Sequence, residues 1–88
     1  MDVILLSQQD CRLCEQAKAT IARLALDHAL TVTEIELASP DGQALAARGG
    51  MLFPPGVFLD GEPFSYGRLS ERKLRKEIER RLGIRRHG

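Results

Sequence analysis

The chain contains two cysteines, Cys11 and Cys14, and only Arg12 and Leu13 stand between them. Two thiols at this spacing in the first turn of a helix lie close enough to form a small disulfide with little backbone movement. The thiolate is the nucleophile in disulfide exchange, and the free N–H groups and dipole at a helix amino end stabilise that anion. Arg12 adds positive charge nearby, although Asp10 opposes it. The spacing therefore predicts a redox-active pair.

In this interpretation Cys11 is the nucleophile and Cys14 is the resolving thiol. A helix amino end can lower the pKa of a cysteine in such a pair from about 8.5 to about 7 or below. Cys11 would attack a substrate disulfide to form a mixed disulfide, and Cys14 would then release the reduced substrate. We therefore expect Cys11 to be exposed and Cys14 to be largely buried.

A zinc site and an inert pair of cysteines are the alternatives. Zinc needs four protein ligands, or three and a water molecule. The remaining candidates are His28, near the far end of the predicted helix, and His87, close to the carboxyl end of the chain. Neither is well placed, so the sequence favours redox chemistry and predicts no metal.

Hydrophobic periodicity and turn signals predict the elements that must position the cysteines. A short apolar run before Cys11 is typical of a buried strand, and apolar positions after Cys14 recur at helical spacing. Asp60-Gly61 between two apolar segments is a strong hairpin signal. The predicted elements are a strand at 3–6, a helix at 12–27, a strand at 31–37, a helix at 41–48, strands at 57–59 and 63–66, and a helix that Ser70 caps and Gly83 ends.

The predicted order is β-α-β-α-β-β-α, which belongs to the α/β class. A helix separates the first two strands, so we expect a parallel pair with a right-handed connection, covered on both faces. The hairpin adds two antiparallel strands. The sequence thus predicts a four-stranded mixed sheet flanked by three helices, in one domain at residues 1–84, with a disordered basic tail at 85–88.

Composition places the chain among globular proteins. The apolar fraction is 43%, no run of about 18 apolar residues is present to span a bilayer, and the first residues lack the pattern of a signal peptide. We therefore expect a cytoplasmic protein with no membrane partner, whose cysteines are kept reduced.

Charge is unevenly distributed along the chain, although the net charge is only +1. Residues 68–88 carry nine Lys or Arg and three Glu, a net +6, whereas residues 1–67 carry four basic and nine acidic residues, a net −5. The predicted last helix is therefore basic, and such a helix can bind an acidic partner. A solvated helix face explains the same charges, and we do not expect nucleic acid as a partner.

Taken together, the motifs resemble those of glutaredoxins, members of the thioredoxin superfamily. The resemblance rests on Cys-x-x-Cys after the first strand and Pro-x-Val-Phe-Leu-Asp-Gly before the last helix, and it covers nearly the whole chain. Cys-x-Leu-Cys with Leu-Asp-Gly-Glu and Gly67-Arg68-Leu69 is similar to compact bacterial glutaredoxin-like proteins. Residues 64–68 (Phe-Ser-Tyr-Gly-Arg) are similar to the glutaredoxin-like electron donors of ribonucleotide reductase. The resemblance implies a thioredoxin fold and thiol–disulfide oxidoreductase activity.

By this resemblance Cys11 is the nucleophile, Cys14 is the resolving cysteine, and Pro54–Pro55 is a cis peptide bond beside the sulfur pair. A cis proline exposes the preceding backbone for pairing with an extended substrate. The substrate site is expected to include seven residues, namely Arg12, Leu13, Pro54, Pro55, Tyr66, Gly67 and Arg68.

Three departures from the glutaredoxin pattern weaken the case for glutathione. Pro54 has no N–H to donate to the cysteine portion of glutathione. Gln8 stands where a lysine normally holds a glutathione carboxylate, and Ser65-Tyr66 stand where two glycines approach the ligand. We therefore predict no tightly bound cofactor and favour thioredoxin reductase over glutathione as the reductant. The expected substrate is a disulfide-containing protein or a small thiol compound.

Three interpretations remain open at this point. Tyr66 is slightly better explained as an aromatic residue of the hairpin or core than as a substrate contact. Arg12 and Arg68 can hold a carboxylate, but Arg68 can equally pair with Glu71 or Glu62 on the surface. The alternative to an oxidoreductase is a non-enzymatic thioredoxin-fold interaction module that binds an acidic partner through its basic C-terminal helix.

Overall fold

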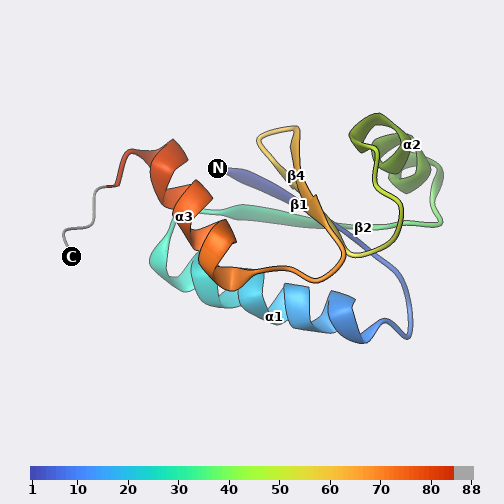
Figure 1. Cartoon of the computed structure of the whole chain (residues 1–88), viewed down its shortest axis with the longest axis horizontal. Helices are drawn as coiled ribbons and strands as arrows, with labels where there is room; N and C mark the ends of the chain where they lie inside the picture. The colour runs from blue at the N-terminus through green and yellow to red at the C-terminus, as the bar shows by residue number, and fades with distance from the viewer. Residues whose placement is uncertain (85–88) are drawn as a thin grey trace.

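The computed structural model describes residues 1–84 and contains the seven elements in the predicted order (Figure 1). The predicted tail at 85–88 lies outside the described residues. Each predicted boundary lies within one residue of the observed one. The elements are β1 (Asp2–Ser7), α1 (Arg12–Asp27), β2 (Thr31–Glu36), α2 (Pro40–Gly49), β3 (Gly56–Leu59), β4 (Glu62–Tyr66) and α3 (Glu71–Leu82).

The sheet has the strand order β2-β1-β3-β4. As expected from the intervening helix, β1 pairs in parallel with β2, whereas β1 with β3 and β3 with β4 are antiparallel. Leu6 of β1 lies beside Gly56 of β3, which lies beside Tyr66 of β4. Cys11 follows Ser7, the last residue of β1, by only four residues, so the amino end of α1 lies at this same end of the sheet (Figure 1). We call it the cysteine end of the molecule.

The main core lies between one face of the sheet and the helices α1 and α3. Side chains alternate along a strand, so every second residue of β1 and β3 points to this face. Burying each large apolar side chain contributes roughly 1.5–3 kcal/mol, which makes this cluster the main source of stability. Its buried members are Val3, Leu5, Ala17, Ile21, Leu24, Val57, Leu59, Leu74 and Ile78.

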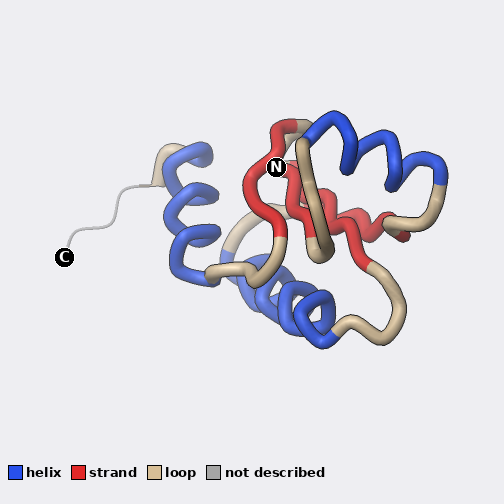
Figure 2. Tube along the Cα trace, turned by 45° about the vertical axis from the view of Figure 1, so that its right-hand side comes forward, coloured by secondary structure: helices blue, strands red, loops and turns tan. Residues whose placement is uncertain are grey.

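The opposite face of the sheet is covered by α2 (Figure 2). Phe58 is fully buried here, and the Arg48 guanidinium lies 5.2 Å from the centre of its ring. A Cβ on Gly49 would lie 2.9 Å from the same ring. Gly49 therefore allows α2 to pack closely on the sheet.

The edge strand β2 is less covered than expected. Most of its residues are exposed, and Val32 retains 44% of its accessible surface. The expectation that both faces of the parallel pair are covered is correct for β1 but wrong for β2. The reason is position in the sheet, since β1 lies between two strands and β2 has a neighbour on one side only.

The hairpin turn has the predicted Asp-Gly form. Asp60 and Gly61 have φ values of 47° and 82°, and two positive φ values are what a type I′ turn requires. The Asp60 carboxylate also accepts the backbone N–H of Asp2 at 2.8 Å. The turn is thereby tied to the start of β1.

The last two helices begin and end as the sequence predicts. Ser39 and Ser70 accept backbone N–H groups at their amino ends, and Gly50 and Gly83 adopt left-handed conformations at their carboxyl ends. These caps satisfy backbone groups that the helices themselves leave unpaired. Within the described residues, no helix combines the length and apolar character needed to cross a membrane.

Candidate functional site

The Cys11–Cys14 pair lies at the amino end of α1, as predicted. Cys11 is the N-cap residue, and its Sγ accepts the backbone N–H of Cys14 at 3.1 Å. A serine or aspartate oxygen usually fills this role, so the sulfur lies where a helix best stabilises negative charge. The Cys11 carbonyl also accepts the N–H of Glu15 at 3.1 Å.

The two sulfur atoms are joined in the structure. The disulfide links Cys11 to Cys14, with their Cα atoms 5.2 Å apart. Cys14 is 1% exposed, whereas Cys11 retains part of its accessible surface. The expected burial of Cys14 is confirmed, whereas Cys11 is half-buried rather than fully exposed. An attacking group therefore reaches the pair from the Cys11 side.

The proline loop completes one side of the cysteine end. Pro54–Pro55 is a cis peptide bond, which confirms the expectation from the resemblance. Pro55 is buried, Pro54 is half-buried, and the Pro55 carbonyl accepts the N–H of Gly67 at 2.8 Å. This hydrogen bond joins the proline loop to the segment that follows β4.

Exposed apolar side chains surround the proline loop. The rings of Phe53 and Tyr66 meet edge to face with centroids 5.1 Å apart, and they retain 54% and 40% exposure. Leu52 is 78% exposed. Gly67 has a φ of 79°, and a Cβ there would lie 2.8 Å from the Phe53 ring. The aromatic pair therefore depends on glycine at position 67.

This arrangement changes the interpretation of Tyr66. Tyr66 is the last residue of β4, so its assignment to the hairpin is correct, but its exposure shows that it is not a core residue. Sequence reasoning missed Leu52 and Phe53, although large apolar residues directly before Pro54 were a usable signal.

The two arginines near the pair have no acidic partner among residues 1–84. Arg12 and Arg68 are exposed, and in the described part of the chain neither side chain forms an ion pair or hydrogen bond. The surface pairing considered for Arg68 is therefore wrong. Glu71 bonds instead to Arg23 and Arg75, and Glu62 bonds to Arg81.

Gln8 and Ser65, which stand at positions where glutaredoxins contact glutathione, and Leu13 lie near the cysteine pair. Gln8 is exposed in the turn after β1, and Ser65 lies within β4 with its Oγ buried and no hydrogen-bond partner among the described residues. Leu13, between the two cysteines, is half-buried. Positions 8, 13 and 65 thus all belong to the cysteine end.

A polar network missed by sequence reasoning lies beneath α1. Glu34 of β2 accepts a 2.6 Å hydrogen bond from the Ser7 hydroxyl and lies 3.3 Å from Lys18 Nζ. The hydrogen bonds from Ser7 and Lys18 hold the pKa of Glu34 below its usual 4.5, and Glu34 raises the pKa of Lys18. Lys18 stands one helical turn after Cys14, so the network adjoins the buried end of the cysteine pair.

The histidine considered as a zinc ligand lies far from the cysteines. His28 caps the carboxyl end of α1, with a buried side chain 3.4 Å from Glu79. His87 lies outside the described residues. Within residues 1–84 no three His, Cys, Asp or Glu side chains cluster as metal ligands would.

Comparison with known proteins agrees with this geometry. Residues 2–79 match the family described as Glutaredoxin-like domain (DUF836). The chain belongs to this family. The DUF836 match includes both cysteines, the proline loop and the segment up to Arg68. No protein with a curated description matches the chain.

Solved thioredoxins share the fold of this DUF836 protein. A mutant thioredoxin from Halobacterium salinarum NRC-1 is 25% identical, with a TM-score of 0.68 over 90% of this chain and 72% of that one. Thioredoxin 1 from Thermosipho africanus TCF52B is 17% identical, with a TM-score of 0.71 over 94% of this chain and 96% of that one. The thioredoxin-like fold expected from the sequence is confirmed.

Proposed function

We propose that this protein is a dithiol oxidoreductase that reduces disulfides in proteins. The observation that carries the proposal is the pair at the start of α1, where Cys11 accepts a helix N–H and keeps part of its surface exposed. Cys14 lies behind it at bonding distance. These are the requirements for one attacking and one resolving thiol.

The reaction proceeds in two exchange steps. The reduced Cys11 thiolate attacks one sulfur of the substrate disulfide, forms a mixed disulfide and releases the first substrate thiolate. Cys14 then loses its proton and attacks Cys11 Sγ, which releases the second substrate thiolate and forms the Cys11–Cys14 disulfide. Two electrons pass to the substrate, and an external dithiol must reduce the protein again.

The surface near the pair supports a protein substrate. Leu52, Phe53 and Tyr66 expose apolar area beside the proline loop, and exposed apolar area of this kind favours contact with another polypeptide. We propose a reducing compartment such as the cytoplasm as the place of action, because the pair must return to its dithiol form.

We further propose that the reductant is thioredoxin reductase or a similar dithiol donor. Pro54 cannot donate an N–H to glutathione, and Gln8 offers no positive charge to a carboxylate. A parallel assay tests this point, with glutathione plus glutathione reductase in one arm and thioredoxin reductase in the other. Turnover with the first system alone would contradict the proposal.

The test of the main proposal is the reduction of a peptide disulfide by pre-reduced protein. The unmodified chain is expected to release two thiols per molecule. Cys11→Ser is expected to fall to the rate of buffer alone, because no exposed nucleophile remains. Cys14→Ser is expected to accumulate the mixed disulfide, which mass spectrometry detects. Full activity in Cys11→Ser would rule out this function.

The basic helix supports a second candidate, an interaction module for an acidic partner. Arg72, Lys73 and Lys76 are exposed on one side of α3, and none forms an ion pair within residues 1–84. Binding of an acidic protein that weakens with salt and is unchanged in Cys11→Ser would favour this function. Binding that depends on Cys11 would favour the oxidoreductase.

A further inference from the structure

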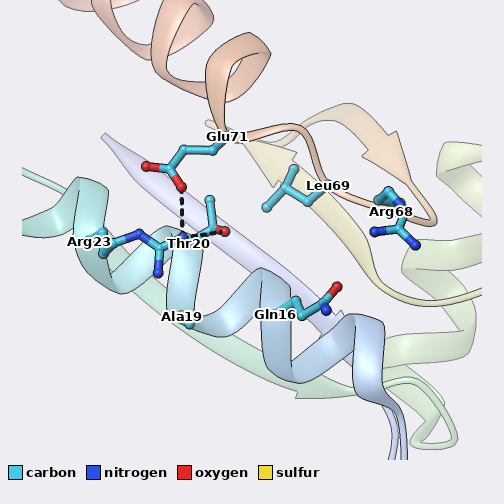
Figure 3. Close-up of a pocket in the computed structure, with 7 residues that line it drawn as sticks. All are labelled: Gln16, Ala19, Thr20, Arg23, Arg68, Leu69 and Glu71. Carbon is cyan, nitrogen blue, oxygen red and sulfur yellow. Dashed lines mark hydrogen bonds and ion pairs between the residues drawn. The ribbon is translucent and has the colours of Figure 1, made fainter.

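A groove runs from the cysteine end along one side of α1. Its volume is about 370 Å³, and Figure 3 shows it between α1 and the segment that leads into α3. Residues of α1 form one wall and residues 68–71 form the other. The lining residues are Gln16, Ala19, Thr20, Arg23, Arg68, Leu69 and Glu71.

At the far end of the groove, the charged side chains are paired with one another. Arg23 donates to Glu71 at 2.7 Å and to the Thr20 hydroxyl at 3.1 Å. Glu71 also lies 3.6 Å from Arg75. The hydrogen bond from Arg23 lowers the pKa of Glu71, so the carboxylate stays ionised and engaged. This end offers a ligand no free charge.

The near end of the groove is open and cationic. Figure 3 shows Arg68 and Gln16 on opposite walls, with the Arg68 guanidinium free of the acidic residues drawn. Arg68 has no side-chain partner within the described residues, and nor does Gln16. A guanidinium carries five donors in a planar fork that fits a carboxylate. Arg68 is therefore an unoccupied carboxylate-binding group.

This open end lies next to the redox pair. Gln16 follows Cys11, the cysteine that forms the mixed disulfide, by five residues, which is about 7.5 Å along a helix that rises 1.5 Å per residue. Gly67, which precedes Arg68, is hydrogen-bonded to the Pro55 carbonyl at 2.8 Å. An extended peptide advances about 3.3–3.6 Å per residue. A chain bound through a mixed disulfide at Cys11 would therefore reach the groove within two or three residues.

We propose that this groove binds the polypeptide segment next to the reactive cysteine of the substrate, and that Arg68 binds an Asp or Glu carboxylate on that segment. The proposal rests on the oxidoreductase function proposed above. Gln16 can pair with the peptide backbone, and Ala19 and Leu69 supply apolar contact. Arg68 thus selects disulfides with an acidic residue two or three positions from the cysteine.

The test measures kcat/KM for matched peptide disulfides. Two peptides differ only in having Glu or Gln at the second and third positions from the cysteine, and glutathione disulfide is the third substrate. We expect the unmodified protein to prefer the Glu peptide about tenfold at low salt, because a charge-assisted bidentate pair exceeds a neutral contact. Arg68→Gln is expected to remove that preference, so that the variant reduces the Glu and Gln peptides at equal rates.

Lys73→Gln serves as the matched control, because Lys73 is an exposed cation of α3 that does not line the groove. It should retain the preference for the Glu peptide. Equal rates for both peptides with the unmodified protein would overturn the proposal. An effect of Arg68→Gln on glutathione disulfide alone would overturn it too, since the carboxylate recognised would then belong to glutathione. Failure to reduce any of the three disulfides would instead refute the oxidoreductase function.

Discussion

The two ends of α1 differ in how tightly they pack against the rest of the protein. At the carboxyl end Asp27 lies 3.4 Å from Arg75 of α3, and the buried His28 lies 3.4 Å from Glu79. Leu24 in the last turns is fully buried in the main core. At the amino end Cys11 caps the helix and Arg12 has no partner within residues 1–84.

This contrast shows how a small fold separates stability from chemistry. The carboxyl half of α1 packs against α3, which lies over it in Figure 1. The amino end keeps its sulfur, an arginine and apolar side chains available to a partner. We therefore expect exposed residues at the open end, such as Arg12, to be replaceable with little cost in folding free energy, whereas buried residues at the packed end are not.

The largest expected difference between the two ends of α1 is in stability, and it is tested by replacing one leucine at each end. Leu24→Ala is expected to lower the free energy of unfolding by about 2–5 kcal/mol, because a fully buried side chain leaves a cavity. Leu13→Ala, at a half-buried position between the cysteines, is expected to cost much less. Denaturant unfolding of the reduced proteins measures both. Equal losses of unfolding free energy in the two variants would contradict the difference between the two ends of α1.

A smaller effect concerns acid and the ion pairs of α3. Hydrogen bonds from Arg80 and Arg81 lower the pKa of Glu77 from 4.5 to about 2. A carboxylate with a lowered pKa stabilises the fold above its ordinary pKa, and this contribution is lost as the pH falls toward the folded value. Stability is therefore expected to decline from about pH 5 toward about pH 2.

Glu77→Gln separates this contribution from the rest. The variant is expected to be less stable than the unmodified protein at about pH 7 and to show a shallower decline in acid, as thermal unfolding at several pH values would record. Its reduction of a peptide disulfide at neutral pH should be unchanged, because Glu77 is far along α3 from the cysteines. An identical acid profile in both proteins would show that these ion pairs contribute nothing.

Local patterns were enough to predict the fold. The order of elements, the parallel first pair and the hairpin all followed from signals such as Asp60-Gly61 and the caps at Ser70 and Gly83. Each of these signals acts through residues that are neighbours in the sequence, so it can be recognised without knowing the tertiary structure. Burial of β2 could not be predicted in this way, because it depends on the order of strands in the sheet.

The candidate site was predicted only in part, for a similar reason. The spacing of Cys11 and Cys14 specified their helix position, and the resemblance gave the cis bond before Pro55. Arg68 has no ion pair within residues 1–84 because Arg23 and Arg75 bind the Glu71 carboxylate, with which Arg68 could otherwise have paired. Such competition between side chains is invisible in the sequence.

Selective alkylation of the reduced protein tests the central claim most directly, which is that the open end of α1 makes Cys11 the nucleophile. Iodoacetamide at about pH 6.5 followed by peptide mass spectrometry reports the rate at each cysteine. We expect Cys11 to react about tenfold faster than the cysteine of an unstructured peptide, because the helix end favours its thiolate. Cys14 should remain unmodified over the same time. Equal reaction at both cysteines, at the rate of the unstructured peptide, would contradict the account.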